Sequence, residues 1–224
     1  GYNYFGAKII PARGAWVELE TETDGVIYGR IDRRRKFPIS ALVRTLASAA
    51  GQVLDDKAIL EMFKKAGVSP EAIEKTLEKD NAKTVDEAYM EIYKRHRDSD
   101  LATPASAREF VDGLFSRERY DFSIVGRLRF NERFGLPVDN KAREDRLLKL
   151  EDLVLTIKNI LELNDNPRAL PDDIDHLGFR RVRSMGEMLQ QRLKVGMTQM
   201  KRHIQDRMST VDSATLLPIQ LVNP

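Results

Sequence analysis

Hydrophobic and polar positions alternate in short runs over the first 38 residues, a pattern that predicts β-strands. Residues 16–20 and 26–31 are two such runs, and the turn pair Asp24-Gly25 stands between them. A shorter apolar run precedes them at residues 8–10. We therefore expect a short antiparallel β-hairpin or sheet near the N-terminus, with residues 16–20 paired to residues 26–31.

From residue 38 to residue 165 the apolar residues recur at the three- and four-residue steps of amphipathic helices. Helix-start signals fall in this region, namely Pro after Ser69 and after Thr103, and a capping box at Thr84-Val85-Asp86-Glu87. Gly51 and Gly67 follow two of the expected helices, as glycine does at helix ends. The apolar stripes are most simply core positions, so the sequence predicts an α+β fold that is mostly helical.

A long helix is expected towards the C-terminus. Ser184-Met185-Gly186-Glu187 has the residues of a second capping box. A helix of about 24 residues from this point would be roughly 36 Å long. Its methionines are adaptable packing groups, which suits contact with another element or domain. The apolar stripe of this helix comprises Met185, Leu189, Leu193, Met197, Met200, Ile204 and Met208.

The composition is that of a globular protein. Its net charge is small, so positive charge can matter only where basic residues cluster. Of the 224 residues, 42% are hydrophobic and 32% are charged, against about 25% charged in an average domain, yet the formal net charge is only +2. There is no cysteine, which excludes disulfides and thiolate metal sites. No apolar run approaches the roughly 18 residues of a membrane span. We expect a soluble cytoplasmic protein without a membrane partner.

Four adjacent cations follow the expected hairpin and are closed off by Pro38. One reading is a solvated strand end. The sharper alternative is a patch that contacts nucleic-acid phosphate, because clustered lysines and arginines neutralise phosphate charge. The four residues are Arg33, Arg34, Arg35 and Lys36.

A second basic stretch lies at residues 115–135, where five arginines are interleaved with four phenylalanines and a tyrosine. Ser123 is placed to cap a short helix that contains Arg127 and Arg129. The stretch is either a basic face over an aromatic core or part of a nucleic-acid surface.

Residues 170–188 concentrate charge of both signs and allow an enzyme hypothesis. Asp173, Asp175 and His176 could hold a divalent cation that activates water, as in a metal-dependent phosphohydrolase. Neither of the other histidines, His96 and His203, stands in a ligand-spaced motif, which weighs against that hypothesis.

Recognition is the other reading of the same stretch. A carboxylate accepts two adjacent hydrogen bonds, and guanine is the base whose Watson–Crick edge offers two adjacent donors. An exposed aspartate in a loop can therefore select an unpaired guanine, while neighbouring arginines hold phosphate or stack on the base. A third possibility is a helical protein-interaction module whose Met-rich helix docks a partner.

These residues resemble the β subunit of bacterial DNA-directed RNA polymerase, which carries a closely similar run at Asp173-Ile174-Asp175-His176-Leu177-Gly178 and at the arginines after it. Several long motifs in collinear order make the resemblance specific over residues 7–38 and 108–224. The other motifs are Ala7-Lys8-Ile9-Ile10-Pro11, Arg13-Gly14-Ala15-Trp16, Arg30-Ile31-Asp32-Arg33-Arg34-Arg35-Lys36, Arg119-Tyr120-Asp121, Val125-Gly126-Arg127 and Leu216-Leu217-Pro218.

The resemblance implies a fragment of a much longer subunit. Residues 1–183 correspond to a lobe-like domain, and residues 184–224 to the returning segment of a protrusion-like domain. In that family the two form one jaw of the cleft that holds downstream DNA. Ile174, Asp175 and Arg180 match the pocket that captures an unpaired guanine of the non-template strand.

The resemblance also implies partners. Besides the non-template strand and the downstream duplex, we expect the β′, α and ω subunits and a sigma factor, in the cytoplasm at the nucleoid. The magnesium-binding aspartates of such polymerases belong to β′, so we expect no catalytic residue, metal or cofactor in this chain. Trp16 matches a residue that stacks on a neighbouring non-template base. The full set expected to bind DNA is Trp16, Arg33, Arg34, Arg35, Lys36, Arg127, Arg129, Ile174, Asp175, Arg180 and Arg183.

Overall fold

The computed structural model describes residues 4–97, 103–140, 144–210 and 217–221. The chain divides into two compact units, residues 1–170 and residues 171–224. The division falls earlier than the boundary expected after Arg183, which stays a prediction. Leu216, part of one of the landmark motifs, lies outside the described residues.

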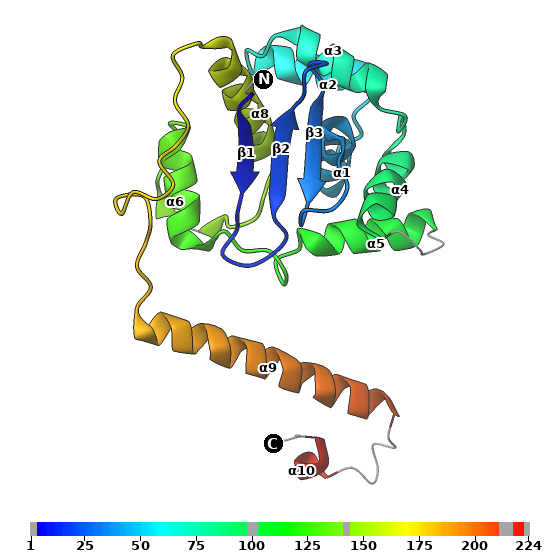
Figure 1. Ribbon diagram of the computed structural model, residues 1–224. Coiled ribbons are helices and arrows are strands. Elements are labelled where there is room, and N and C mark those ends of the chain that lie inside the picture. Colours follow the sequence, from blue (N-terminus) through cyan, green and yellow to red (C-terminus); the bar gives the residue numbers. More distant parts are fainter. Residues whose placement is uncertain (1–3, 98–102, 141–143, 211–216, 222–224) are drawn as a thin grey trace. The chain divides into compact units, whose positions relative to one another are not determined.

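An antiparallel sheet forms the N-terminal part of the first unit, with the strands in chain order (Figure 1). Its strands are β1 (Gly6–Ile9), β2 (Val17–Thr21), β3 (Ile27–Ile31) and β4 (Phe37–Pro38). Val17 pairs with Ile31 and Thr21 with Ile27, so the predicted hairpin is confirmed. The alternation of side chains buries Val17 and Leu19 on the inner face. The sequence did not predict β4, which is two residues long and contains a proline.

Helices cover the inner face of this sheet and extend beyond it, so the α+β class with mostly helical content is confirmed. In Figure 1, α1 and α8 lie behind the strands, and both contact the sheet. Capping signals act as expected, because Thr84 and Glu87 form a reciprocal capping box and Ser123 Oγ accepts the Gly126 N–H at 3.2 Å. The helices of this unit are α1 (Ile39–Ala49), α2 (Asp56–Lys65), α3 (Pro70–Lys79), α4 (Val85–His96), α5 (Pro104–Leu114), α6 (Ser123–Arg133) and α8 (Leu150–Asp165).

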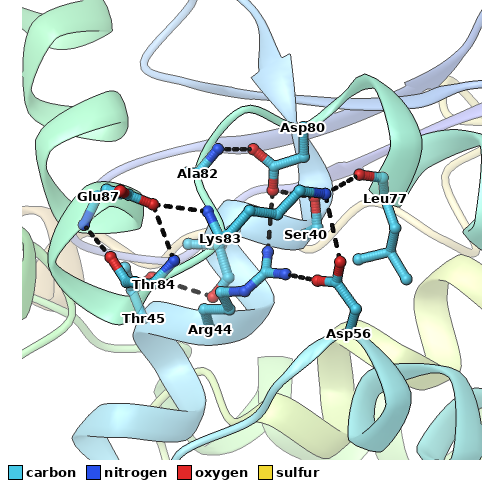
Figure 2. A network of polar contacts seen from close by, with 11 residues as sticks. Ser40, Arg44, Thr45, Asp56, Leu77, Asp80, Ala82, Lys83, Thr84 and Glu87 are labelled. Atoms are coloured by element: carbon cyan, nitrogen blue, oxygen red, sulfur yellow. Dashed lines mark hydrogen bonds and ion pairs between the residues drawn. The ribbon is translucent and has the colours of Figure 1, made fainter.

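An ionic network that is buried at Arg44 and Asp80 holds α1 against the helices that follow it (Figure 2). Arg44 on α1 is fully buried, and its guanidinium donates to Asp80 Oδ2 at 2.9 Å and to Asp56. Asp80 also accepts from Ser40 Oγ at 2.5 Å. Lys83 Nζ reaches Asp56 at 3.2 Å and the carbonyl oxygen of Leu77. The network therefore connects α1, the start of α2 and the end of α3 through charge-assisted hydrogen bonds.

The second unit contains α9 (Met185–Thr210) and α10 (Pro218–Leu221). The predicted long helix is confirmed, and within the described residues none of its side chains is buried. Leu193 and Met197 in the middle of the apolar stripe are 61% and 59% exposed. The Ser184 hydroxyl accepts the Glu187 N–H, and the Glu187 carboxylate accepts from the Arg181 guanidinium.

Candidate nucleic-acid interface

Trp16, the one tryptophan of the sequence, lies where β2 begins and β3 ends. Because Val17 pairs with Ile31, Trp16 and Asp32 stand opposite each other just beyond the ladder. The backbone N–H of Trp16 donates to Asp32 Oδ1 at 2.8 Å, and the backbone N–H of Asp32 donates to the Trp16 carbonyl oxygen at 2.9 Å. The backbone of Trp16 is therefore held at two points, while its side chain is only partly buried.

The chain reverses direction directly after Asp32. Asp32 and Arg33 have φ values of 51° and 59°, and the Arg34 N–H donates to the Ile31 carbonyl oxygen at 3.0 Å. This is a two-residue turn in the left-handed region, which aspartate adopts more readily than arginine. The turn brings the Arg33 guanidinium to 5.0 Å from the centre of the Trp16 ring.

The four predicted cations of this region have different surroundings. Arg33, Arg34 and Arg35 are exposed, as a phosphate-contacting patch requires. Lys36 is partly buried, pairs with Glu22 and lies 4.5 Å above the Tyr28 ring. Lys36 is therefore held against the outer face of the sheet.

A second loop, residues 117–121, packs against the segment just before Trp16 because Gly14 allows close contact. Arg13 and Asp121 form a bridge through two backbone hydrogen bonds of 3.1 and 2.8 Å. Gly14 has a φ of +124°, and a Cβ at this position would lie 2.8 Å from Tyr120 Cδ2 and 3.0 Å from the Arg119 carbonyl oxygen. Only glycine fits both constraints.

Three more exposed arginines reach the same end of the sheet through this bridge. Arg13 Nη2 donates to the Arg117 carbonyl oxygen at 3.3 Å, which joins the two loops. Sequence reasoning recognised both motifs but missed their juxtaposition, because no sequence signal pairs residues so far apart. The Trp16 surface, as we name it, comprises Trp16 and the exposed side chains of Arg13, Arg33, Arg34, Arg35, Arg117 and Arg119.

Burial corrects the expectation for Arg127. Its guanidinium is 3% exposed and forms a paired contact with both oxygens of Asp152, at 2.7 and 2.9 Å. Arg127 Nε also donates to the Asp145 carbonyl oxygen at 2.6 Å, and the Phe122 ring lies 4.8 Å away. A side chain bonded in this way holds α6 to α8 and cannot reach DNA phosphate. Arg129, on the same helix, is exposed.

His96, at the end of α4, lies close to Asp32, the first residue of the turn described above. Its Nε2 is 3.9 Å from Asp32 Oδ2, and its ring lies 5.0 Å from the Phe110 ring. Burial lowers the pKa of His96, and the attraction of Asp32 only partly offsets that effect. The imidazole is therefore neutral at pH 7. It does not form a charged pair with the Asp32 carboxylate.

In the second unit, Asp173 organises the loop that carries the predicted base pocket. Asp173 Oδ1 accepts the N–H groups of Asp175 and His176 at 3.3 and 3.2 Å. The Gly178 N–H donates to His176 Nδ1 at 3.0 Å, where a Cβ on Gly178 would lie only 2.9 Å from that nitrogen. The loop is shaped by its own residues, as in an Asx-turn.

Asp175 and Arg180 come together on the exposed side of this loop. Arg180 Nη1 lies 3.6 Å from Asp175 Oδ1, with the two side chains 65% and 87% exposed. Ile174 is 75% exposed beside them. Arg183 is also exposed and donates to Gln191 Oε1 at 3.4 Å. The three residues expected to form a pocket are thus neighbours, and Asp173 rather than Asp175 caps the loop.

Arg181 has a structural partner. Its guanidinium forms a two-pronged contact with the Glu187 carboxylate in the first turn of α9. This hydrogen bonding lowers the pKa of Glu187, so the pair stays charged well below neutral pH. The contact attaches the loop to the start of α9.

Two negative findings apply to the part of the chain that the structure describes. No group of three or more His, Cys, Asp or Glu side chains is arranged to hold a metal ion there. No helix in the same ranges has both the length and the apolar character needed to cross a membrane.

Comparison with known proteins gives consistent matches. The family model described as "RNA polymerase Rpb2, domain 2" matches residues 4–183. The DNA-directed RNA polymerase subunit beta of Syntrophomonas wolfei is 42% identical over 224 residues, which is all of this chain and 19% of the relative. Those of Gloeobacter violaceus and a Synechocystis strain are 36% and 35% identical over 225 residues, again covering 100% of this chain and 19% of each relative. The chain spans about a fifth of the length of these curated relatives.

Proposed function

Because this chain belongs to the β-subunit family of DNA-directed RNA polymerase, we propose that it lines the channel for downstream DNA and binds the non-template strand during transcription. Its partners are then the β′, α and ω subunits, a sigma factor, and DNA at the nucleoid. The polymerase reaction belongs to that assembly. This chain contributes no catalytic group, and the magnesium ion is held by β′.

The observation that carries this proposal is the Trp16 surface. It joins a partly exposed indole to arginines from three segments that are distant in sequence, around residues 13, 33–35 and 117–119. Single-stranded nucleic acid is commonly bound by an aromatic ring, on which a base stacks, within a groove of positive charge that follows the backbone. A partly exposed aromatic ring and exposed arginines are both present at this end of the sheet.

The Asp175 loop supplies base selection in this proposal. The Asp175 carboxylate is 87% exposed, and its contact with Arg180 at 3.6 Å is a weak surface pair that a ligand can displace. Guanine offers two adjacent donors to such a carboxylate, and a bidentate base contact discriminates by about 1–3 kcal/mol. Arg180 can then turn to phosphate or stack on the base. Phe179 stands in this loop where many family members have asparagine, and it adds an aromatic ring 5.6 Å from His176.

Salt dependence tests the strand-binding proposal. We expect the 224-residue chain to bind a labelled single-stranded oligonucleotide with an affinity that falls as salt rises. Replacing Arg34 and Arg35 by glutamine should weaken binding to all sequences alike and flatten the slope of log K against log salt by roughly 1.4, at about 0.7 per phosphate contact.

The matched control neutralises two exposed lysines of α2, Lys64 and Lys65, since α2 lies near the opposite end of the sheet in Figure 1. This control should leave the slope unchanged. Equal slopes for both double variants and the unaltered chain would show that residues 33–35 are a solvated turn.

The two alternative functions are less well supported. A metal-dependent phosphohydrolase built on Asp173, Asp175 and His176 needs a cation site. The described residues contain no such group, and Asp173 is engaged in capping its own loop. A protein-interaction module would use the exposed stripe of α9, but it leaves the Trp16 surface and the match to residues 4–183 unexplained.

A further inference from the structure

Arg33 differs from its neighbours in what it contacts. Its guanidinium lies 5.0 Å from the centre of the Trp16 ring, and it reaches that position because Asp32 and Arg33 both adopt left-handed backbone conformations. Arg34, one residue further on, makes no ring contact among those the structure describes. A guanidinium over an indole is a stacking and cation–π arrangement, in which planarity matters as well as charge.

Asp32 contacts the backbone of Trp16, whereas Arg33 contacts its ring. Its Oδ1 accepts the Trp16 N–H at 2.8 Å while its own N–H returns a hydrogen bond to the Trp16 carbonyl oxygen. Aspartate and asparagine are the side chains that combine such an acceptor with tolerance of the left-handed region. One residue thus fixes the backbone of Trp16 and starts the turn that delivers Arg33.

We infer that Asp32 and Arg33 are positioning residues for Trp16: Asp32 fixes its backbone and Arg33 restrains its ring, so that the indole is held ready for an unpaired base. This inference rests on the proposed function, in which Trp16 stacks on a base of the non-template strand. It reassigns Arg33 from a phosphate contact to a support for the stacking ring. Arg34 and Arg35 remain as the phosphate contacts of the turn.

The single tryptophan allows a direct test without any ligand. In the 224-residue chain, tryptophan fluorescence, excited selectively over that of the tyrosines, reports on Trp16 alone. Arg33→Lys keeps the charge but loses the planar group, so quenching of Trp16 by acrylamide should increase. Arg34→Lys is the matched control and should leave quenching unchanged. Equal quenching in the two variants would overturn the inference.

Binding of a labelled single-stranded oligonucleotide supplies the second readout. Arg33→Lys should lower affinity by about two- to fivefold, the size of an exposed cation–π contact, although no charge is lost. A residue that only contacts phosphate would tolerate lysine, so an unchanged affinity for Arg33→Lys would also overturn the inference.

Asp32 is tested by two substitutions. Asp32→Asn keeps the acceptor and the left-handed tendency, and it should preserve both quenching and affinity. Asp32→Ala removes both and should increase quenching and weaken binding. If alanine prevents folding, the asparagine variant still decides, because a large change in its Trp16 quenching would contradict the positioning role.

Failure of the proposed function gives a different pattern. If the unaltered chain bound no oligonucleotide, strand binding would be refuted, whereas the quenching comparison of Arg33→Lys with Arg34→Lys would still measure the restraint on Trp16. Binding of unaltered chain with identical behaviour of both lysine variants would refute the inference alone.

Discussion

Arginines chosen from the two units show two opposite kinds of surroundings. In the first unit, Arg44 and Arg127 are 0% and 3% exposed and are bonded to the buried carboxylates of Asp80 and Asp152. In the second unit, Arg180 and Arg183 are exposed beside a loop whose hydrogen bonds are local. The comparison shows that being an arginine does not by itself tell whether a residue stabilises the fold or is available to bind a ligand. An arginine belongs to the fold where a buried carboxylate meets it, and it is available to a ligand elsewhere.

The same contrast holds for apolar residues. The helices of the first unit bury their stripes, so that Leu153 and Ile157 on α8 are fully covered. The stripe of α9 has the same periodicity, yet Leu193 is 61% exposed. The buried core among the described residues is built from residues of the first unit.

The largest expected effect is from breaking the buried network of Figure 2. Arg44→Ala leaves Asp80 charged and buried without its partner, which should lower the free energy of unfolding by about 3–5 kcal/mol. Arg34→Ala is the matched surface substitution and should change it by less than about 0.5 kcal/mol. Denaturant unfolding measures both. Similar small losses would mean that water reaches Asp80 and that the network is not a buried one.

The second prediction compares a buried leucine of the first unit with an exposed leucine of α9, each replaced by alanine. Leu153→Ala should cost about 2–5 kcal/mol because it opens a cavity in the core of the first unit. Leu193→Ala should leave the same unfolding transition essentially unchanged, since its side chain is exposed. If Leu193→Ala lowered the free energy of unfolding by more than about 1 kcal/mol, the stripe of α9 would be packed in solution. The contrast between the two units in apolar burial would then be wrong.

Adding one methyl group at Gly14 should have an intermediate effect. Gly14→Ala forces a Cβ against Tyr120 at a φ of +124°, so a cost of about 1–3 kcal/mol and a rise in Trp16 quenching are expected. Gly51→Ala is the control, because Gly51 also has a positive φ, of +78°, but has nothing within 4 Å of the added Cβ. If both glycine substitutions had the same effect on stability and on Trp16, close packing of the two loops would be refuted.

Much of the fold was predictable because its signals are local. The hairpin followed from alternation and from Asp24-Gly25, and the starts of α4 and α5 followed from capping residues. Strand β4 was missed, since its two residues have no periodicity and its pairing with β3 is decided by the tertiary fold. Periodicity identifies the apolar face of α9 but not what covers that face.

The site was predictable only in part for the same reason. Arg33, Asp175 and Arg180 form local features, and all three side chains are exposed. Arg127 was misplaced because its environment depends on Asp152, which is 25 residues away and gives no sequence signal of pairing. The contribution of Arg119 was missed because a bridge between Arg13 and Asp121 brings its backbone against Gly14, two residues before Trp16.

The central claim is that recognition lies in exposed loops which the fold does not need, and Asp175→Ala tests it most directly. The measurement is the open-complex lifetime of a polymerase whose β subunit carries this chain, with each of the four bases in turn at the downstream edge of the non-template strand. The melting temperature of the variant 224-residue chain is measured alongside. We expect the advantage of guanine, about 1–3 kcal/mol, to disappear while the lifetimes with other bases and the melting temperature change little. A retained preference for guanine together with a lower melting temperature would contradict the account, because Asp175 would then serve the fold through Arg180.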